Sequence, residues 1–488
     1  MNRITMLAVF ACVAMTGIVS AQTQLTREAF LIKVLAANQS LQVRRLEKKV
    51  STQQVVREEA AFDPVLSISG QYEDSLQQNT TEDFFRRNNL DLYQEKNSTM
   101  NLGISGVLHS GTRYEAAYSV RRLRNSLSNM QTQYQANASL TITQPLLQNR
   151  GTDVTRARVR LAERDADIAH QELRSTTLSM VSEAESLYWD LVLAQDEIKL
   201  RTESVEMART LYDYQEKRLE LNKIGDLEVE QADVGLRMRV AQRTAAAQNL
   251  AETINRFRTL LSEPVTANTY VADDRPETEQ QKFDRDTVMQ QALEHNPDYF
   301  VQKLELDKTD IRLIVADNMQ WPRLDLVGTY GQNGLDEELH QGHDYLVDET
   351  TNDWSVLLQF QMAIGNRQAH SELEAARLRQ QQAILNLKRL EIELGNAVDT
   401  VLGRIDTTYQ QMQTLADVTK LNLRVLNDEQ QLLKNGKSNS RRILESEEDL
   451  FEARQSEMRG RIDFQKVILA LATIEGTLLQ AHGFRVEE

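Results

Sequence analysis

The chain has 488 residues, of which only six are prolines and one is cysteine, and its formal net charge is −16. A mean hydropathy of −0.50 excludes a protein built from many transmembrane helices, because each such helix needs about 20 mainly apolar residues. The acidic balance argues against nucleic acid as a partner, since phosphate binding needs clustered Lys and Arg. The scarcity of proline leaves room for very long helices.

Residues 1–21 predict a secretory signal peptide, because Arg3 precedes an apolar run that ends in the small-residue site Val19-Ser20-Ala21. Two alternatives are a membrane anchor, which would need a stop-transfer pattern that does not follow, and lipidation at Cys12, which the bulky Phe10 disfavours. Cleavage after Ala21 removes the cysteine, so we expect packing rather than disulfides to stabilise the mature chain.

A tandem duplication organises the rest of the chain. Segment 26–72 matches segment 284–330 at a constant offset, which pairs Asn38 with Asn296 and Pro64 with Pro322. Each copy runs from an amphipathic helix through the proline into an alternating strand. We therefore predict a first structural repeat at 22–262, a connector at 263–283 and a second repeat at 284–488.

Alternation with a period of two predicts strands at about 64–143 in the first repeat and about 323–363 in the second. One side of each strand is apolar and the other is small and polar, which suits a wall between lipid and water. A soluble β-sandwich with one wet face is the alternative. Five aromatic residues are candidates for a membrane-interface belt: Tyr72, Tyr114, Tyr118, Tyr330 and Trp354.

Two long helical hairpins are predicted at about 151–262 and about 368–480, which contain no proline and many good helix formers. Ala162, Ala166, Ala169 and Leu173 begin a heptad seam of small and apolar residues that lets neighbouring helices approach closely. An ordinary dimeric coiled coil is the alternative, but it does not explain the strands between the helices.

Five motifs follow one another in a fixed order along the chain: strand-to-helix junctions at 143–151 and 361–367, hairpin tips at 222–232 and 434–445, and a closing motif at 476–479. This ordered set resembles the TolC-like outer-membrane efflux proteins, also called outer membrane factors. The resemblance implies a mostly α fold with membrane β, in which a trimeric outer-membrane β-barrel is continuous with a long periplasmic α-helical barrel.

The resemblance also implies a function. The chain would be a passive homotrimeric channel in the outer membrane, with its helical tube in the periplasm, serving a tripartite efflux or type I secretion system. Its partners would be a periplasmic adaptor (membrane fusion protein), an inner-membrane transporter and outer-membrane lipid. A periplasmic coiled-coil adaptor and a structural envelope protein are the alternatives. The substrate is not defined by the sequence.

One feature departs from the usual family pattern of two strands in each repeat. The hairpin at 98–122 is extra, so the first repeat has four predicted strands and the second has two. Six strands in each protomer would give an eighteen-stranded trimeric barrel, and a twelve-stranded barrel with one hairpin outside the wall is the alternative.

The hairpin tips are the predicted functional sites. Candidates for a periplasmic gate or selectivity ring are Glu445, Arg442, Arg441 and Glu228, where Arg442 would weaken the field of Glu445 or pair with it. The alternative is that these residues are only solvent-exposed charges at the start of a helix. Gly225 and Gly436 are expected to end their helices. Adaptor docking is expected at Lys223, Ile224, Gly225, Asp226, Leu227, Asn435, Gly436, Lys437 and Ser438.

No pattern of catalytic residues points to an enzyme, and we expect no cofactor. His340, His343 and Asp344 could be drawn as a metal site, but a solvated outer loop is the favoured interpretation of this segment.

Overall fold

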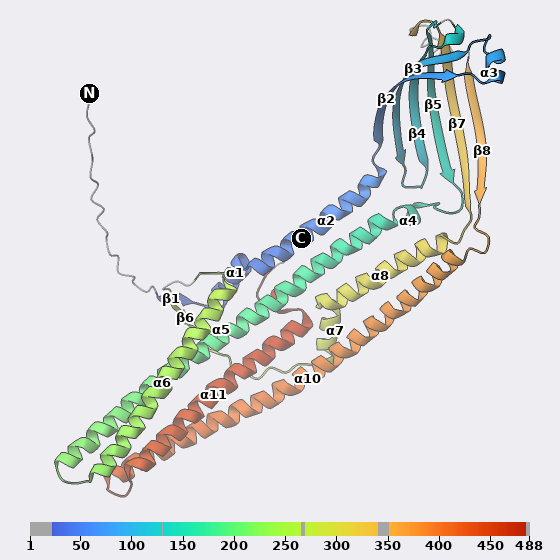
Figure 1. The fold of residues 1–488 in the computed structure, drawn as a ribbon. Coiled ribbons are helices and arrows are strands. Elements are labelled where there is room, and N and C mark those ends of the chain that lie inside the picture. Colours follow the sequence, from blue (N-terminus) through green and yellow to red (C-terminus); the bar gives the residue numbers. More distant parts are fainter. Residues whose placement is uncertain (1–21, 129, 265–268, 340–350, 485–488) are drawn as a thin grey trace, which may run out of the picture. The chain divides into compact units, whose positions relative to one another are not determined.

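A computed structural model describes residues 22–128, 130–264, 269–339 and 351–484 (Figure 1). The chain divides into two compact units. The first contains the described parts of Met1–Arg45, Glu172–Asp298 and Leu390–Glu488, and the second contains Leu46–Gln171 and the described parts of Tyr299–Arg389. The predicted signal peptide (residues 1–21), with Cys12, and the segment from His340 to Asp344 lie outside the described residues.

The second unit holds an antiparallel sheet of six strands in the order β2-β3-β4-β5-β7-β8. The strands are β2 (Val65–Gln78), β3 (Leu92–Val107), β4 (Arg113–Leu123), β5 (Gln133–Pro145), β7 (Arg323–Asp336) and β8 (Asn352–Gln361). Four come from the first repeat and two from the second, so the described chain contributes the six strands expected of one protomer. Helix α3 (Thr81–Arg86) lies between β2 and β3.

The strand register gives this sheet one apolar face and one polar face. Leu140 lies opposite Ala116 on one side and Tyr330 on the other, and Ile104 and Trp354 extend the same row. The next residue along β5, Thr141, lies opposite Glu115 and Thr329 on the polar face. Because side chains alternate along a strand, this register keeps the apolar side chains of all six strands together.

Helices account for most of the remaining residues. They are α1 (Arg27–Ala37), α2 (Gln39–Glu59), α4 (Thr152–Thr155), α5 (Ala157–Glu220), α6 (Asp226–Leu260), α7 (Arg285–His295), α8 (Pro297–Asn318), α10 (Arg367–Lys434), α11 (Ser440–Glu475) and α12 (Leu478–Ala481). α5 has 64 residues and α10 has 68, as the lack of proline predicts. Among the described residues, no helix combines the length and the apolar character needed to cross a bilayer.

Equivalent asparagines in the two matched segments make the same contact. Asn38 ends α1 and Asn296 ends α7, each as the C-cap residue. The side-chain amide of Asn38 donates to the carbonyl of Leu260 at the end of α6, and that of Asn296 donates to the carbonyl of Ile474 near the end of α11, both at 3.1 Å. Each asparagine thus satisfies a carbonyl that a helix end leaves without an intrahelical partner.

The core of the first unit forms around the middle of α5. Phe30 stacks on Phe257 with ring centroids 3.6 Å apart, and the buried Tyr188 packs beside them. Strands β1 (Gln22–Leu25) and β6 (Thr269–Ala272) pair in parallel. The hydroxyl of Tyr188 donates to Asp274 at 2.8 Å, and burial raises the pKa of Tyr188 to about 12.

A buried carboxylate ties the C-terminal segment to this core. Glu185 on α5 accepts hydrogen bonds from Arg27 and His482, each at 2.9 Å. Burial alone would raise the pKa of Glu185, but the His482 hydrogen bond and the Arg27 charge outweigh burial and lower the pKa. A depressed pKa means that this carboxylate stabilises the fold above the usual pKa and loses its effect as the pH falls.

We expect Glu185→Gln to lower the free energy of unfolding by about 2 kcal/mol near pH 7, because the charge-assisted hydrogen bonds are lost. The difference from wild type should shrink as the pH falls below the ordinary value of 4.5 through the lower folded pKa. Denaturant unfolding followed across this pH range measures it. Glu183→Gln, on the exposed side of the same helix turn, is the control and should show neither effect. A difference that stays constant with pH would contradict this role of the charge.

Candidate functional site

Both helix-hairpin tips in the first unit turn in the same way. After α5, Asn222 donates its backbone N–H to Leu219 and Lys223 donates to Arg218. After α10, Gly436 donates to Leu433 and Lys437 donates to Leu432. This pair of bonds is a Schellman motif, in which the residue just past the helix adopts the left-handed conformation.

The expected role of Gly225 is therefore wrong, and that of Gly436 is confirmed. Gly436 has φ +71°, whereas Gly225 has φ −89° and is the N-cap of α6. The left-handed residue of the first tip is Asn222, with φ +55°. Asparagine tolerates this conformation better than most residues with a side chain, so it can take the place of glycine here.

The predicted docking residues surround these turns. Lys223 and Lys437 occupy equivalent places in the two Schellman motifs, and both are exposed. Gly225, Asp226, Asn435 and Gly436 are also exposed, whereas Ile224 and Ser438 are half-buried. Ser438 donates to Glu429 at 2.5 Å. Leu227, the first apolar residue of α6, is largely exposed.

Of the four predicted gate residues, Arg441 and Glu445 are in contact with each other. Glu445 accepts a hydrogen bond from Arg441 at 2.8 Å, four residues earlier on α11, and both side chains are exposed. Arg442 contributes its backbone N–H to the N-cap Asn439, so the structure gives Glu445 a partner other than the expected Arg442. Arginines three and four residues before a glutamate can both reach it along a helix, so sequence spacing alone does not decide between Arg442 and Arg441. Glu228 is exposed in the first turn of α6.

A cavity of about 840 Å³ lies between the first turns of α6 and α11. Leu227, Val234 and Met238 of α6 line one side, and Leu444 of α11 faces them with the Arg441–Glu445 pair. Three predicted site residues, Leu227, Arg441 and Glu445, thus share one groove.

The deepest polar contact near this groove was not predicted. Arg239 of α6 is only 6% exposed. Its guanidinium donates to the Ser204 hydroxyl of α5 and to the Leu444 carbonyl of α11, both at 3.1 Å, and lies 3.8 Å from each of Glu447 and Glu448. We call these five residues the Arg239 cluster. It connects three helices of two different hairpins.

A second arginine supports this cluster from α5. Arg201 lies 3.6 Å from Glu448, donates to Gln242 at 2.8 Å and stacks over the Phe451 ring at 3.6 Å. Burial raises the pKa of Glu447, and the charge of Arg239 opposes that rise. Two arginines and two glutamates therefore lie close together, and Arg239 and Glu447 among them are almost fully buried, so loss of one of these two partners is costly.

The sequence contains a pattern that marks Arg239 as a buried residue. The buried positions Ala232, Arg239, Ala246 and Thr253 of α6 follow one another at intervals of seven. Small residues one heptad away on each side leave room for a large side chain in the seam. An arginine at a core heptad position is rare unless it is paired, so it marks a buried ionic contact.

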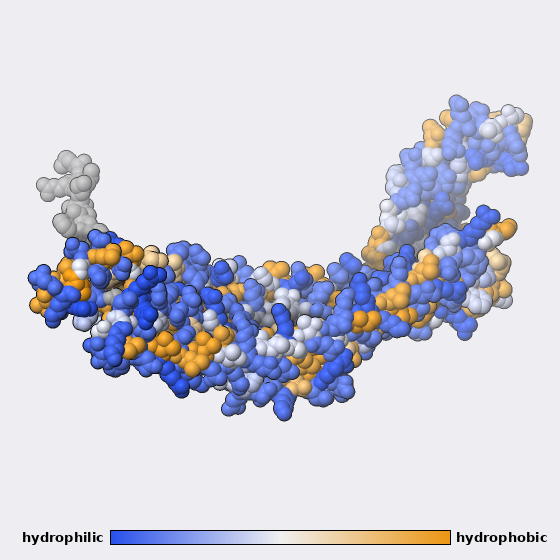
Figure 2. All heavy atoms as spheres, turned by 90° about the horizontal axis from the view of Figure 1, so that it is seen from below, coloured by the Kyte–Doolittle hydropathy of each residue, from blue (hydrophilic) through white to orange (hydrophobic). Residues whose placement is uncertain are grey.

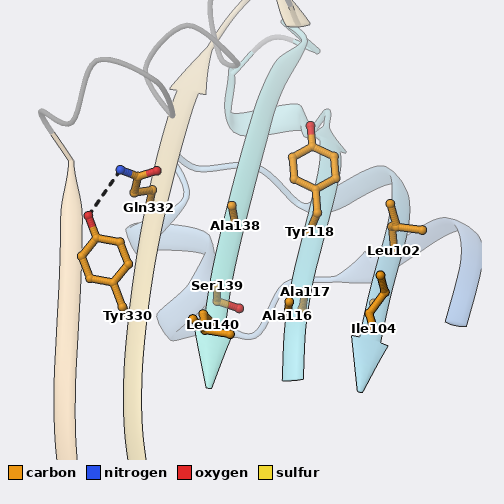
Figure 3. Close-up of a pocket in the computed structure, with 11 residues that line it drawn as sticks. Leu102, Ile104, Ala116, Ala117, Tyr118, Ala138, Ser139, Leu140, Tyr330 and Gln332 are labelled. Atoms are coloured by element: carbon orange, nitrogen blue, oxygen red, sulfur yellow. Dashed lines mark hydrogen bonds between the residues drawn. The ribbon is translucent and has the colours of Figure 1, made fainter. Parts of the chain in front are cut away.

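The predicted interface aromatics lie on the apolar face of the sheet in the second unit. Tyr330 lies directly opposite Trp354. Tyr118 is on the same face, beside Ala138 (Figure 3). Between them Ala116 and Ala138 form the floor of a hollow of about 390 Å³ that Leu102, Ile104, Leu140 and Tyr330 surround. Gln332 donates to the Tyr330 hydroxyl at 3.4 Å.

Of the other two aromatics, Tyr114 lies at the start of β4 and Tyr72 lies in the middle of β2. Tyr114 follows the tight turn between β3 and β4, and its ring covers Gly106, where an added Cβ would lie 2.7 Å from the ring carbon that bears the hydroxyl. Tyr72 lies opposite Ser98 on the edge strand β2 and is largely exposed. Their place at a membrane interface stays a prediction.

Over the described residues, no group of three or more His, Cys, Asp or Glu side chains is arranged to hold a metal ion.

Comparison with known proteins gives the family. The family model described as outer membrane efflux protein matches residues 31–263 and 288–477. Among curated proteins, none matches the chain. The fold is similar to the CmeC outer membrane channel of Campylobacter jejuni (TM-score 0.65, 16% identity, 100% of this chain and 95% of that one).

Two further crystal structures have the same fold. The CusC structures, which concern folding and transmembrane channel formation, match with a TM-score of 0.66 and 15% identity over 92% of each chain. The open state of the Neisseria gonorrhoeae MtrE outer membrane channel matches with a TM-score of 0.63 and 15% identity, over 92% of this chain and 88% of that one. The resemblance expected from the sequence motifs is confirmed, and the chain belongs to the TolC-like outer membrane efflux protein family.

Proposed function

We propose that three copies of this chain form a passive channel in the outer membrane, the exit duct for substrates delivered by an inner-membrane pump and a periplasmic adaptor. The observation that carries the proposal is the six-stranded sheet, whose apolar face extends over all six strands and whose edges, β2 and β8, pair with no further strand among the described residues of one chain. Lipid does not tolerate open sheet edges, so such a sheet must close with further copies. Three copies give eighteen strands around a polar lumen.

The helices also need neighbours. Leu378, Leu385 and Ile392 recur every seven residues along α10, and each is more than half exposed in a single chain. Val43, Leu46 and Val50 form a similar exposed stripe on α2. Figure 2 shows apolar patches interrupting an otherwise hydrophilic surface. Heptad stripes of this kind are typical of helices that pack against other helices, which supports a tube shared by the copies.

The hairpin tips would carry the gate and the adaptor contacts. An opening movement that separates α11 from α6 must break the bonds from Arg239 to Leu444, Glu447 and Glu448, so we assign the closed state to the intact Arg239 cluster. The exposed Arg441–Glu445 pair would face the mouth and act on passing ions. The paired turns at Lys223 and Lys437, with Leu227 at the start of α6, would receive the adaptor.

Arg239→Gln should favour the open channel. Loss of charge-assisted hydrogen bonds worth about 1.5–3 kcal/mol shifts the equilibrium between closed and open states roughly ten- to a hundredfold. Single-channel recording measures this as a larger open probability. Arg237→Gln is the matched control, because Arg237 lies on the same helix, is largely exposed and pairs only with Asp233 among the described residues. Equal open probabilities in both variants would remove the Arg239 cluster from the gate.

Membrane fractionation tests the function itself. The mature chain should sediment with the outer membrane and run as a trimer that heating dissociates. A monomer in the periplasmic fraction would instead favour a periplasmic adaptor or a structural envelope protein. Deleting the turns at 222–225 and 435–438 should leave the trimer folded and abolish copurification of the adaptor. A tip-deleted trimer that still retains its adaptor would place docking elsewhere.

A further inference from the structure

A second cavity, of about 820 Å³, lies within the second unit where the strands meet the helices. Four arginines line it: Arg113 at the start of β4, Arg158 in α5, Arg312 in α8 and Arg379 in α10. Glu372 is the single acidic residue among the described residues of its lining. In a chain with a net charge of −16, such a concentration of positive charge is unusual.

These arginines differ from their neighbours in having no protein partner. Within the part of the chain that the structure describes, none of the four forms a hydrogen bond or an ion pair with a protein group. Nearby arginines of the same unit are paired: Arg156 with Glu59 at 2.8 Å, Arg160 with Asp153 at 3.2 Å, Arg164 with Asp167 at 2.8 Å, and Arg323 with Asp325 at 2.6 Å. The four guanidiniums that line the cavity are therefore unpaired among the described residues, as are those of Arg122 and Arg367, which do not line it.

Helical spacing explains how the cavity forms. Arg312, Val315, Ala316 and Met319 lie on one face of α8, and Glu372, Ala376 and Arg379 lie on one face of α10. Between the charges, Leu161, Val315 and Met319 supply apolar surface. The lining therefore combines cations with apolar side chains, which suits a solute that has both characters.

The sheet shows on which side the cavity lies. Val107 and Arg113 both line it, and they lie opposite each other in the β3–β4 register. Both belong to the polar face, two residues along from the Ser105–Glu115 pair. If the polar face lines the lumen, as the proposed function requires, the cavity opens to the path of the substrate.

We propose that this cavity is a binding station for anionic amphiphiles, organic solutes that carry carboxylate, sulfonate or phosphate groups on an apolar body. The inference rests on the proposed channel function. A channel built from chains with a net charge of −16 disfavours anions overall, and a local group of arginines offsets that cost where the strands meet the helices. Guanidinium groups bind such oxyanions with two parallel hydrogen bonds. Exposure to the lumen keeps the binding weak enough for release.

Binding of hydroxypyrene trisulfonate to the purified trimer in neutral detergent tests the proposal. Fluorescence polarisation should show saturable binding, and the triple variant Arg158→Gln, Arg312→Gln, Arg379→Gln should weaken it by at least about tenfold. The matched control is Arg164→Gln, Lys303→Gln, Arg377→Gln, which removes three positive charges from the same helices outside the cavity. Its affinity should equal that of the wild type.

The outcomes distinguish failure of the proposed binding site from failure of the proposed channel function. Equal weakening in both triple variants would reduce the effect to net charge and overturn the site. Loss of copurified anionic phospholipid from the arginine variant, without binding of the trisulfonate to the wild type, would also overturn it in favour of a lipid site. If the triple variant does not assemble, each single variant must weaken binding. A wild-type trimer that conducts ions but does not bind the probe refutes the station and leaves the channel intact.

Discussion

Gly476→Ala should prevent the mature chain from folding into a stable trimer. Gly476 ends α11 in the left-handed conformation, with φ +73°. An added Cβ would collide with the carbonyl oxygen of His295 and lie 2.7 Å from its carbonyl carbon, which is backbone and cannot rotate away. Left-handed strain costs about 1–2 kcal/mol and overpacking about 1–3 kcal/mol more. We expect a loss of about 2–5 kcal/mol from each protomer.

Gly436→Ala separates the two contributions. Gly436 has nearly the same φ, +71°, but no atom lies within 4 Å of the position of its Cβ. This control should lose only the strain of about 1–2 kcal/mol. The yield of heat-modifiable trimer and its melting temperature measure both variants. Equal effects at the two positions would show that the contact with His295 does not matter.

The second large effect concerns the apolar face of the sheet. Leu140→Arg places a charge on that face, at the centre of β5 between Ala116 and Tyr330. An arginine on the lipid side of a membrane strand costs about 2–4 kcal/mol near the bilayer midplane, and a trimer carries three. We expect the variant to disappear from the outer-membrane fraction.

Thr141→Arg is the matched control, because it adds the same charge one residue further along the strand, on the polar face opposite Glu115. A wet lumen accommodates arginine, so this variant should insert and form trimers like the wild type. Normal insertion of Leu140→Arg, or equal loss of both variants, would contradict the assignment of the apolar face to lipid.

The strands and long helices could be predicted because their signals are local. Alternation with a period of two gives both the strands and their apolar face, and the absence of proline gives α5 and α10. The duplication predicted that matched residues of the two copies have equivalent structural roles, and the contacts of Asn38 and Asn296 agree with this. The family motifs located the tips to within a few residues.

The site residues were harder to predict, because their partners depend on three-dimensional packing. Gly225 is of the residue type expected in a left-handed turn, but Asn222 is the residue that adopts this conformation. Glu445 pairs with Arg441 rather than Arg442, and because both lie within helical reach of it, only the side-chain conformations decide the partner. The buried contact of Arg239 was not predicted, although its heptad position can be read from the sequence. The arginines that line the second cavity come from four separate elements, so no sequence window contains them together.

Conductance of the purified protein in a planar bilayer tests the central claim most directly. A trimeric duct predicts discrete, ohmic current steps when detergent-solubilised trimers are added, with longer openings for Arg239→Gln than for wild type or Arg237→Gln. If trimers insert into the bilayer but neither the wild type nor Arg239→Gln produces any current step, the chain is not a channel.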